Sequence, residues 1–317
     1  MGLNTPPDLR IRLGPLVLKN PVVTASGTFG YGTEFLPYLD LARLGGICVK
    51  GLSLKPRKGN PPPRTAEIPA GMLNAIGLAN VGVEAFVAKK LPALRRFDTA
   101  VIANVFGETV EEYAEVARIL SAAEGVAALE LNISCPNTEK GGRVFGCDPD
   151  GTSRVVSAVR RVSSLPLIVK LTPNVTDILT VARAAVESGA DILSLVNTFL
   201  GIAVDLEGRR MVLANGVGGV SGPAIRPQAL YLVHRVCSEV KVPVMGMGGI
   251  MSASDALEFL LVGARAVQVG TANFVDPAAS VKILDGIAAY FQSRGIPSVA
   301  HFVGSLKESR QSTIFST

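Results

Sequence analysis

Residues 128–137 place three groups capable of chemistry at the end of a predicted strand. The segment reads Ala-Leu-Glu-Leu-Asn-Ile-Ser-Cys-Pro-Asn, and its first half is a short apolar run typical of a buried strand. It ends on the amide of Asn132, the hydroxyl of Ser134 and the thiol of Cys135, and Pro136 disfavours a helix at that point. Taken alone, Cys135 is best interpreted as a small buried hydrophobic residue, as free cysteines usually are. The alternative is an acid/base group.

The same pattern recurs where the other apolar runs end. One lysine there would be unremarkable, because most lysines are solvated, but two lysines and three asparagines favour a shared polar pocket. Cys135 and the two lysines are therefore the candidate acid/base groups, whereas structural roles are expected for His234 and His301. The run ends are Ser26, Lys50-Gly51, Asn104, Asn132, Lys170, Asn197-Thr198, Gly248-Gly249 and Gly270-Thr271.

Glycines end the last two of these runs. Glycine lets backbone N–H groups approach an anion at a helix N-terminus, and barrels bind phosphate at the ends of their seventh and eighth strands. A tight turn is the alternative for Gly248-Gly249. A polar pocket with amides, glycines and no evident metal ligands suggests a phosphorylated cofactor.

Alternating apolar and amphipathic segments must position these groups. Strand followed by helix argues for a parallel sheet, and eight such units predict an α/β fold, the (β/α)8 TIM barrel. The competing architecture is an open doubly wound sheet, whose G-x-G-x-x-G fingerprint is missing from the first βα turn. The expected strands are 21–27, 45–51, 100–106, 128–134, 165–172, 190–198, 242–249 and 266–271; the expected helices are Val110–Ala122, Ser153–Val162, Ile178–Ser188, Arg226–Val240 and Ala253–Leu261.

Three further segments complete the predicted single domain, residues 1–317. Alternation over residues 9–19 around Gly14-Pro15 predicts an N-terminal β-hairpin that caps one end of the barrel. Residues 52–80 and 199–223 are too long for plain loops, and the second contains a hairpin-like stretch over 205–213. Both follow strands, so we expect them as insertions on the C-terminal face, where they would shape a site.

Bulk composition narrows the function classes. The chain has 317 residues, 48% of them hydrophobic, and a net charge of +5 from scattered basic residues, which gives little support for nucleic acid binding. Four cysteines without a C-x-x-C pair suggest reduced thiols rather than a zinc or iron–sulfur site. No stretch approaches the roughly 18 apolar residues of a membrane span. We expect a soluble, cytoplasmic protein.

Taken in order, the motifs resemble those of class 1B dihydroorotate dehydrogenases, specifically their catalytic flavoprotein subunit. The resemblance covers essentially the whole chain. It is carried by Asn74-Ala-Ile-Gly-Leu, Asn132-Ile-Ser-Cys-Pro-Asn, Val169-Lys-Leu-Thr-Pro-Asn, Asn197-Thr, the glycine-rich stretch 213–225, Gly246-Met-Gly-Gly-Ile and Val269-Gly-Thr-Ala-Asn-Phe.

The resemblance implies an FMN-dependent oxidation of (S)-dihydroorotate to orotate in de novo pyrimidine (UMP) biosynthesis. Cys135 would be the base that takes the C5 proton, assisted by Lys50, and residues 136–142 would form a lid. Substrate would be bound by Lys50, Asn74, Ala75, Ile76, Gly77, Leu78, Asn132, Asn197 and Thr198. The flavin would be bound by Ser26, Lys50, Gly51, Asn104, Asn132, Lys170, Val196, Gly222, Gly248, Gly249, Gly270 and Thr271, with Lys170 stabilising the reduced ring.

The resemblance also implies a partner. A subunit with FAD and a [2Fe–2S] cluster would pass electrons to NAD+, in a homodimer or a heterotetramer. Two other functions remain open. One is a flavin barrel acting on another pyrimidine, as in a dihydropyrimidine dehydrogenase module or a tRNA-dihydrouridine synthase; the other is a non-catalytic barrel that binds a phosphate ligand or scaffolds an assembly.

Overall fold

Eight parallel strands form a closed barrel in the computed structural model, which describes residues 6–134, 136–137 and 143–307. Each strand pairs with the next along the chain, and the last pairs with the first. The predicted barrel is thus confirmed, because each predicted apolar run contains one barrel strand. The strands are β3 (Val22–Thr24), β4 (Gly46–Cys48), β7 (Ala100–Val105), β8 (Ala128–Asn132), β11 (Leu167–Lys170), β12 (Ile192–Leu195), β17 (Val244–Met247) and β18 (Ala266–Val269).

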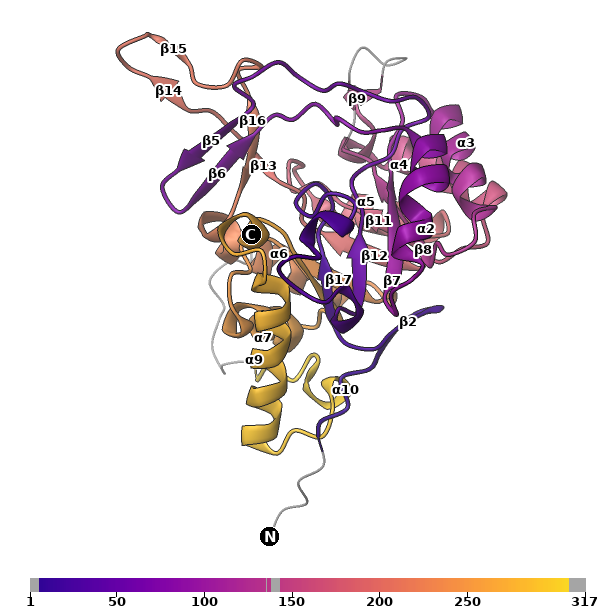
Figure 1. The fold of residues 1–317 in the computed structure, drawn as a ribbon, viewed down its shortest axis with the longest axis vertical. Coiled ribbons are helices and arrows are strands. Elements are labelled where there is room, and N and C mark those ends of the chain that lie inside the picture. The colour runs from indigo at the N-terminus through magenta and orange to yellow at the C-terminus, as the bar shows by residue number, and fades with distance from the viewer. Residues whose placement is uncertain (1–5, 135, 138–142, 308–317) are drawn as a thin grey trace.

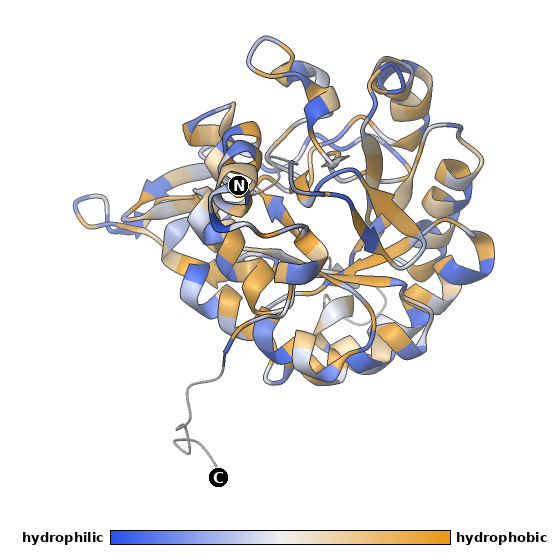
Figure 2. Cartoon of the chain, turned by 90° about the horizontal axis from the view of Figure 1, so that it is seen from below, coloured by the Kyte–Doolittle hydropathy of each residue, from blue (hydrophilic) through white to orange (hydrophobic). Residues whose placement is uncertain are grey.

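Helices surround the barrel and pack against one another in chain order (Figure 1). Their apolar faces meet the strands, which Figure 2 shows as a mostly hydrophobic centre. The five predicted helices are all present. The helices are α1 (Val83–Ala85), α2 (Leu91–Leu94), α3 (Val110–Ser121), α4 (Pro149–Val162), α5 (Ile178–Glu187), α6 (Arg226–Glu239), α7 (Ala253–Leu261), α8 (Ala272–Val275), α9 (Ala279–Arg294) and α10 (Val299–Phe302), with a π-helical turn, Phe86–Lys90, between α1 and α2.

The N-terminal hairpin is present as β1 (Ile11–Leu13) paired with β2 (Leu16–Leu18). Its leucines are buried in the core. The carbonyl of Arg12 accepts a hydrogen bond of 3.5 Å from Arg265, the residue that precedes β18. The hairpin therefore lies against the N-terminal ends of the strands. It leaves the C-terminal ends of the strands uncovered, and a site can form there.

The two predicted insertions join in one four-stranded antiparallel sheet. Strands β5 (Thr65–Ile68) and β6 (Gly71–Asn74) follow β4, whereas β13 (Phe199–Gly201) and β16 (Gly218–Ser221) follow β12. β16 pairs with β6, with Gly219 opposite Asn74. A further hairpin, β14 (Val204–Asp205) with β15 (Arg210–Met211), projects beyond this sheet (Figure 1). The hairpin predicted over residues 205–213 thus begins at Val204, one residue before its predicted start.

A last short strand pair, β9 (Pro136–Asn137) with β10 (Arg143–Val144), follows β8. Strand β9 forms the first two residues of the segment predicted to be a lid, and β10 follows that segment. Residues 138–142 of that segment lie outside the described residues, so the lid prediction is not tested.

Candidate active site

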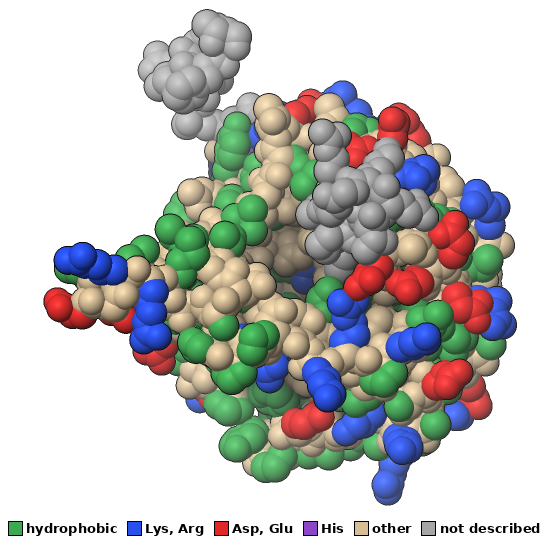
Figure 3. Space-filling model, turned by 90° about the horizontal axis from the view of Figure 1, so that it is seen from above, with side chains coloured by type: hydrophobic (Ala, Val, Ile, Leu, Met, Phe, Trp, Pro, Cys, Tyr) green, Lys and Arg blue, Asp and Glu red, His purple; other side chains and the backbone are tan. Residues whose placement is uncertain are grey.

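A cavity of about 640 Å³ opens at the C-terminal ends of the barrel strands. Its volume lies in the range of small-molecule and cofactor sites. Figure 3 shows the hollow near the middle of this face, with Lys or Arg side chains at its depth. Residues of both insertions contribute to its wall. The prediction that these insertions shape a site on this face is therefore confirmed.

The predicted site residues that the structure describes all line this one cavity. Strand ends supply most of them, as expected, and the rest come from the insertions. They are Ser26, Lys50, Gly51, Asn74, Ala75, Ile76, Gly77, Leu78, Asn104, Asn132, Lys170, Val196, Asn197, Thr198, Gly222, Gly248, Gly249, Gly270 and Thr271. Cys135 lies outside the described residues. His234, on α6, and the exposed His301, on α10, do not line the cavity.

Amides and hydroxyls at the ends of β8 and β12 form a connected group. Asn197 donates from Nδ2 to Ser134 Oγ at 2.9 Å and to Asn132 Oδ1 at 3.4 Å. Its own Oδ1 accepts from the backbone N–H of Thr198 at 2.9 Å. The phenol of Tyr113 donates to the backbone carbonyl of Asn132 at 2.6 Å. These bonds fix the orientation of amides that can both donate to and accept from a ligand.

Lys50 stands on the cavity wall just beyond β4. It is half-buried, and its pKa lies below the usual lysine value, first because burial disfavours the charged form and next because the Arg64 guanidinium is near. The Glu34 carboxylate acts in the opposite direction. Lys50 is therefore a cation that an anionic ligand would stabilise.

Glycines make a cradle at the ends of β17 and β18. Gly248 and Gly249 have φ angles of 124° and 76°, which favour glycine. A Cβ on Gly249 would lie 2.7 Å from Arg226 Cβ and 2.9 Å from the backbone oxygen of Gly222. Gly249 thus lies against the N-terminal end of α6, where the helix dipole favours an anion. Beyond β18, Thr271 donates to Ser221 Oγ at 2.8 Å and ties the second glycine loop to the insertion sheet.

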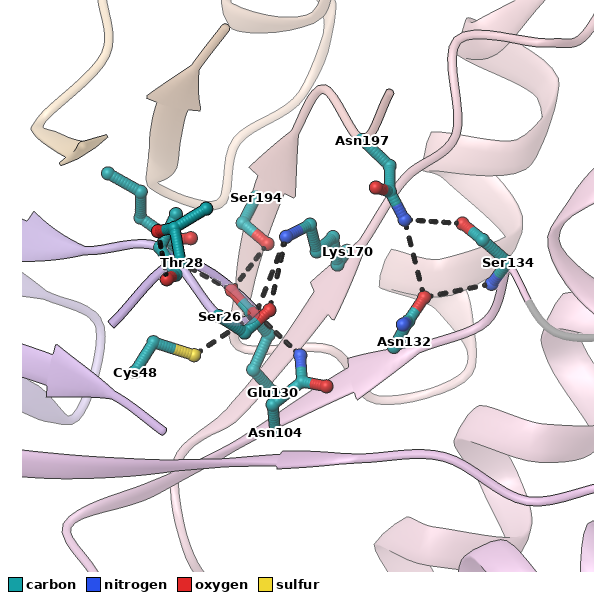
Figure 4. A network of polar contacts seen from close by, with 12 residues as sticks. Ser26, Thr28, Cys48, Asn104, Glu130, Asn132, Ser134, Lys170, Ser194 and Asn197 are labelled. Carbon is teal, nitrogen blue, oxygen red and sulfur yellow. Dashed lines mark hydrogen bonds and ion pairs between the residues drawn. The ribbon is translucent and has the colours of Figure 1, made fainter. Parts of the chain in front are cut away.

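The cavity floor carries a buried lysine. Lys170 is 5% exposed, and its Nζ lies 3.4 Å from Ser26 Oγ and 4.0 Å from Glu130 Oε1. Glu130, in β8, is fully buried and collects hydrogen bonds from several strands (Figure 4). Beside it, burial and then the Glu130 carboxylate raise the pKa of Cys48 well above its usual range, so this cysteine is a thiol.

Sequence reasoning missed five polar residues of the site. Thr28, Thr65, Ser221 and Gln268 line the cavity, and Glu130 lies behind its wall. A signal was available for two of them, because Glu130 and Gln268 interrupt apolar strands at central positions, where a polar group needs a partner. Thr65 has no such signal, since the sheet that carries it forms between distant segments. Among the described residues no cluster of three or more His, Cys, Asp or Glu is arranged to hold a metal ion.

These features define a class of protein. A closed barrel that gathers cations, amides and glycines in one cavity at the carboxyl ends of its strands is typical of a (β/α)8 barrel enzyme. Within that class, the chain belongs to the dihydroorotate dehydrogenase family, whose family model matches residues 9–291.

Curated relatives match over nearly their whole length. The chain is 57% identical over 301 residues to a protein of Geotalea daltonii, covering 95% of this chain and 99% of the relative. It is 58% identical over 301 residues to one of Trichlorobacter lovleyi, with the same coverage of both chains. Both relatives are named dihydroorotate dehydrogenase B (NAD(+)), catalytic subunit.

Proposed function

We propose that this chain is the catalytic subunit of an NAD+-linked dihydroorotate dehydrogenase, which oxidises (S)-dihydroorotate to orotate in pyrimidine biosynthesis. The observation that carries the proposal is the single cavity in which buried Lys170, the amides of β8 and β12, and the glycine cradle meet. Full-length similarity to relatives with that name supports it.

We propose FMN as the cofactor, since the residues present fit it. Gly249 packs against the N-terminal end of α6 with no room for a Cβ, which suits a close approach of backbone to phosphate, and the cavity volume of about 640 Å³ suits a flavin. When bound, FMN supplies an acceptor for the hydride that leaves C6 of the substrate. Gly222, Gly248, Gly249, Gly270 and Thr271 would hold its phosphate. Ser26, Gly51, Asn104, Asn132 and Val196 would line the ring, with Lys170 at its edge as a positioned cation.

The pyrimidine would lie between Lys50 and the amide group. Its carboxylate would meet Lys50 and the loop of residues 74–78, and its ring amides would meet Asn132, Asn197 and Thr198. Cys135 would take the C5 proton as the hydride leaves C6. Lys50 would supply the positive charge that favours the thiolate. Together these residues bind the substrate, orient it and remove the proton.

We further propose a partner subunit with FAD and a [2Fe–2S] cluster, and a homodimer or a heterotetramer as the assembly. The relatives' names include the word subunit, which supports a partner. Within the described residues, no helix combines the length and apolar character needed to cross a membrane. We propose that the enzyme works in the cytoplasm and that residues 1–317 act as one domain.

An anaerobic half-reaction tests the function. Purified wild-type protein is mixed with dihydroorotate, and flavin absorbance is followed at neutral pH. We expect rapid bleaching in the wild type and bleaching slower by about 10²- to 10⁴-fold in Cys135→Ser, the range lost when a general base is removed. Cys147→Ser is the control, since Cys147 is exposed and does not line the cavity.

Three other results would each contradict a part of the proposal. A yellow protein that dihydroorotate does not bleach would retain the flavin and reject the substrate, and other pyrimidines would be tried. A protein that FMN cannot colour would reject the enzyme. Equal rates in wild type and Cys135→Ser would reject the base alone.

A further inference from the structure

Glu130 is a charged residue in the middle of a barrel strand, where a buried carboxylate is costly. It is fully buried and is not part of the cavity wall. An ionised carboxylate in such a place must be paired and hydrogen-bonded, or it would take up a proton. The identity of its partners therefore indicates its charge state.

Four side chains from four other strands donate to this carboxylate. Oε1 accepts from Asn104 Nδ2 at 2.8 Å and from the thiol of Cys48 at 3.2 Å. Oε2 accepts from Gln268 Nε2 at 2.5 Å and from Ser194 Oγ at 3.0 Å. Four hydrogen-bond donors and a nearby ammonium group favour the ionised form of a carboxylate.

Three of the groups around Glu130 belong to the cavity wall. Asn104, Lys170 and Gln268 line the cavity, and Glu130 stands directly behind them. Lys170 Nζ is 4.0 Å from Oε1, an ion-pair distance too long for a hydrogen bond. The carboxylate thus attracts the ammonium group without accepting a hydrogen bond from it, and Nζ instead donates to Ser26 Oγ on the cavity wall at 3.4 Å. Figure 4 shows Glu130 at the centre of this group.

We propose that Glu130 is a positioning residue that orients the cavity-wall side chains and, through its negative charge behind Lys170, lowers the reduction potential of the flavin. The inference rests on the proposed function, because it requires a flavin in the cavity. Reduction adds negative charge to the flavin, which Lys170 favours and Glu130 opposes. In a buried site such charges are weakly screened. The pair therefore sets a potential lower than Lys170 alone would give.

The reduction potential of the bound flavin tests the proposal directly. It is measured by reductive titration against a reference dye, without dihydroorotate. Glu130→Gln removes the charge in nearly the same shape. We expect its two-electron equilibrium to shift toward reduced flavin by about tenfold or more, which is about 30 mV or more to positive potential. Ser194→Ala, which removes one neutral donor and keeps the charge, is expected to shift the potential much less.

A charge-rescue set keeps the test decisive if Glu130→Gln does not fold. Lys170→Met leaves Glu130 uncompensated, so we expect its flavin potential to fall well below the wild-type value. The double variant Lys170→Met/Glu130→Gln removes both charges, a change that buried ion pairs often tolerate. Its potential should return toward the wild-type value. If Glu130 had only a structural role, the flavin potential of the double variant would not return toward the wild-type value.

The outcomes separate this inference from the proposed function. A yellow wild type whose potential matches that of Glu130→Gln, or a double variant no higher in potential than Lys170→Met, overturns the role of Glu130 alone. A wild type that binds no FMN overturns the proposed function, and the inference falls with it.

Discussion

Lys50 is the residue at which binding and pH are expected to be coupled. Burial and then the Arg64 cation lower its pKa from the usual 10.5. Its ammonium form is therefore complete only below the lowered pKa and is lost at a pH where an exposed lysine is still charged. Between the lowered pKa of Lys50 in the folded chain and its ordinary pKa in the unfolded chain, the unfolded chain binds more protons than the folded one. The free energy of unfolding therefore rises with pH in this range. Over the same range, the positive charge that Lys50 offers to the substrate falls.

Orotate affinity should follow the charge of Lys50. We expect the dissociation constant, measured by flavin spectral titration, to increase as pH rises through the lowered pKa. Lys50→Met should weaken binding about 10- to 150-fold at neutral pH, which corresponds to the ~1.5–3 kcal/mol of a hydrogen bond to a charged group. Lys58→Met is the control, because Lys58 is exposed and does not line the cavity.

Lys50→Arg checks the cause of the pH dependence. Arginine stays charged throughout the range, so this variant should lose the alkaline weakening whatever its affinity at neutral pH. If it weakens with pH as the wild type does, another group is responsible.

Residue types at strand ends predicted much of the site, but they did not predict the role of Glu130. The end of a parallel strand in a barrel points at a shared cavity, so Lys170 and Asn104 could be placed from the chain alone. Glu130 lies two residues before Asn132, inside the barrel, and its role depends on partners from four other strands. The spacing of residues along one sequence does not indicate those partners.

At the scale of elements, the glycine cradle depends on backbone conformations that other residues resist. Gly249→Ala would place a Cβ 2.9 Å from both the Arg226 nitrogen and the Gly222 oxygen, at a φ of 76°. We expect the loop to shift and FMN affinity to fall at least about tenfold, or ~1.4 kcal/mol. Titration of apoprotein with FMN, followed by flavin fluorescence, measures this change.

Gly295→Ala is the matched control for backbone strain. Gly295 has a φ of 64° at the end of α9, and a Cβ there would meet nothing within 4 Å. Its left-handed conformation should cost about 1–2 kcal/mol of stability without affecting FMN affinity. If both variants bind FMN as the wild type does, the cradle is not the phosphate site.

Four of the five predicted helix starts match the structure, and one is wrong. The helix expected from Ser153 begins at Pro149, because Asp148 caps it by accepting from the Gly151 backbone at 2.7 Å and Pro149 suits a first turn. The Pro-Asp-Gly sequence there is equally typical of a turn. The long helix α9 was not predicted, although its buried Leu284, Ile287 and Phe291 have helical spacing.

At the scale of the whole molecule, the proposed function requires electrons to leave the barrel to reach NAD+. We expect the flavin-loaded chain alone to oxidise dihydroorotate with an artificial dye but not to reduce NAD+. Adding the proposed FAD- and iron–sulfur-containing subunit should confer NADH formation, measured by absorbance, with omission of dihydroorotate as the control. NADH formation by the isolated chain would contradict the proposed division of labour.

The sheet that joins the two insertions links segments that are far apart in the chain. Asn74 donates to the backbone oxygen of Gly219 at 3.2 Å, across 145 positions, and β6 and β16 share one register. A chimera that took residues 52–80 from a relative and kept its own residues 199–223 would have to restore that register. The two segments therefore have to be exchanged together. Whether a substitution in one segment is tolerated depends on the sequence of the other.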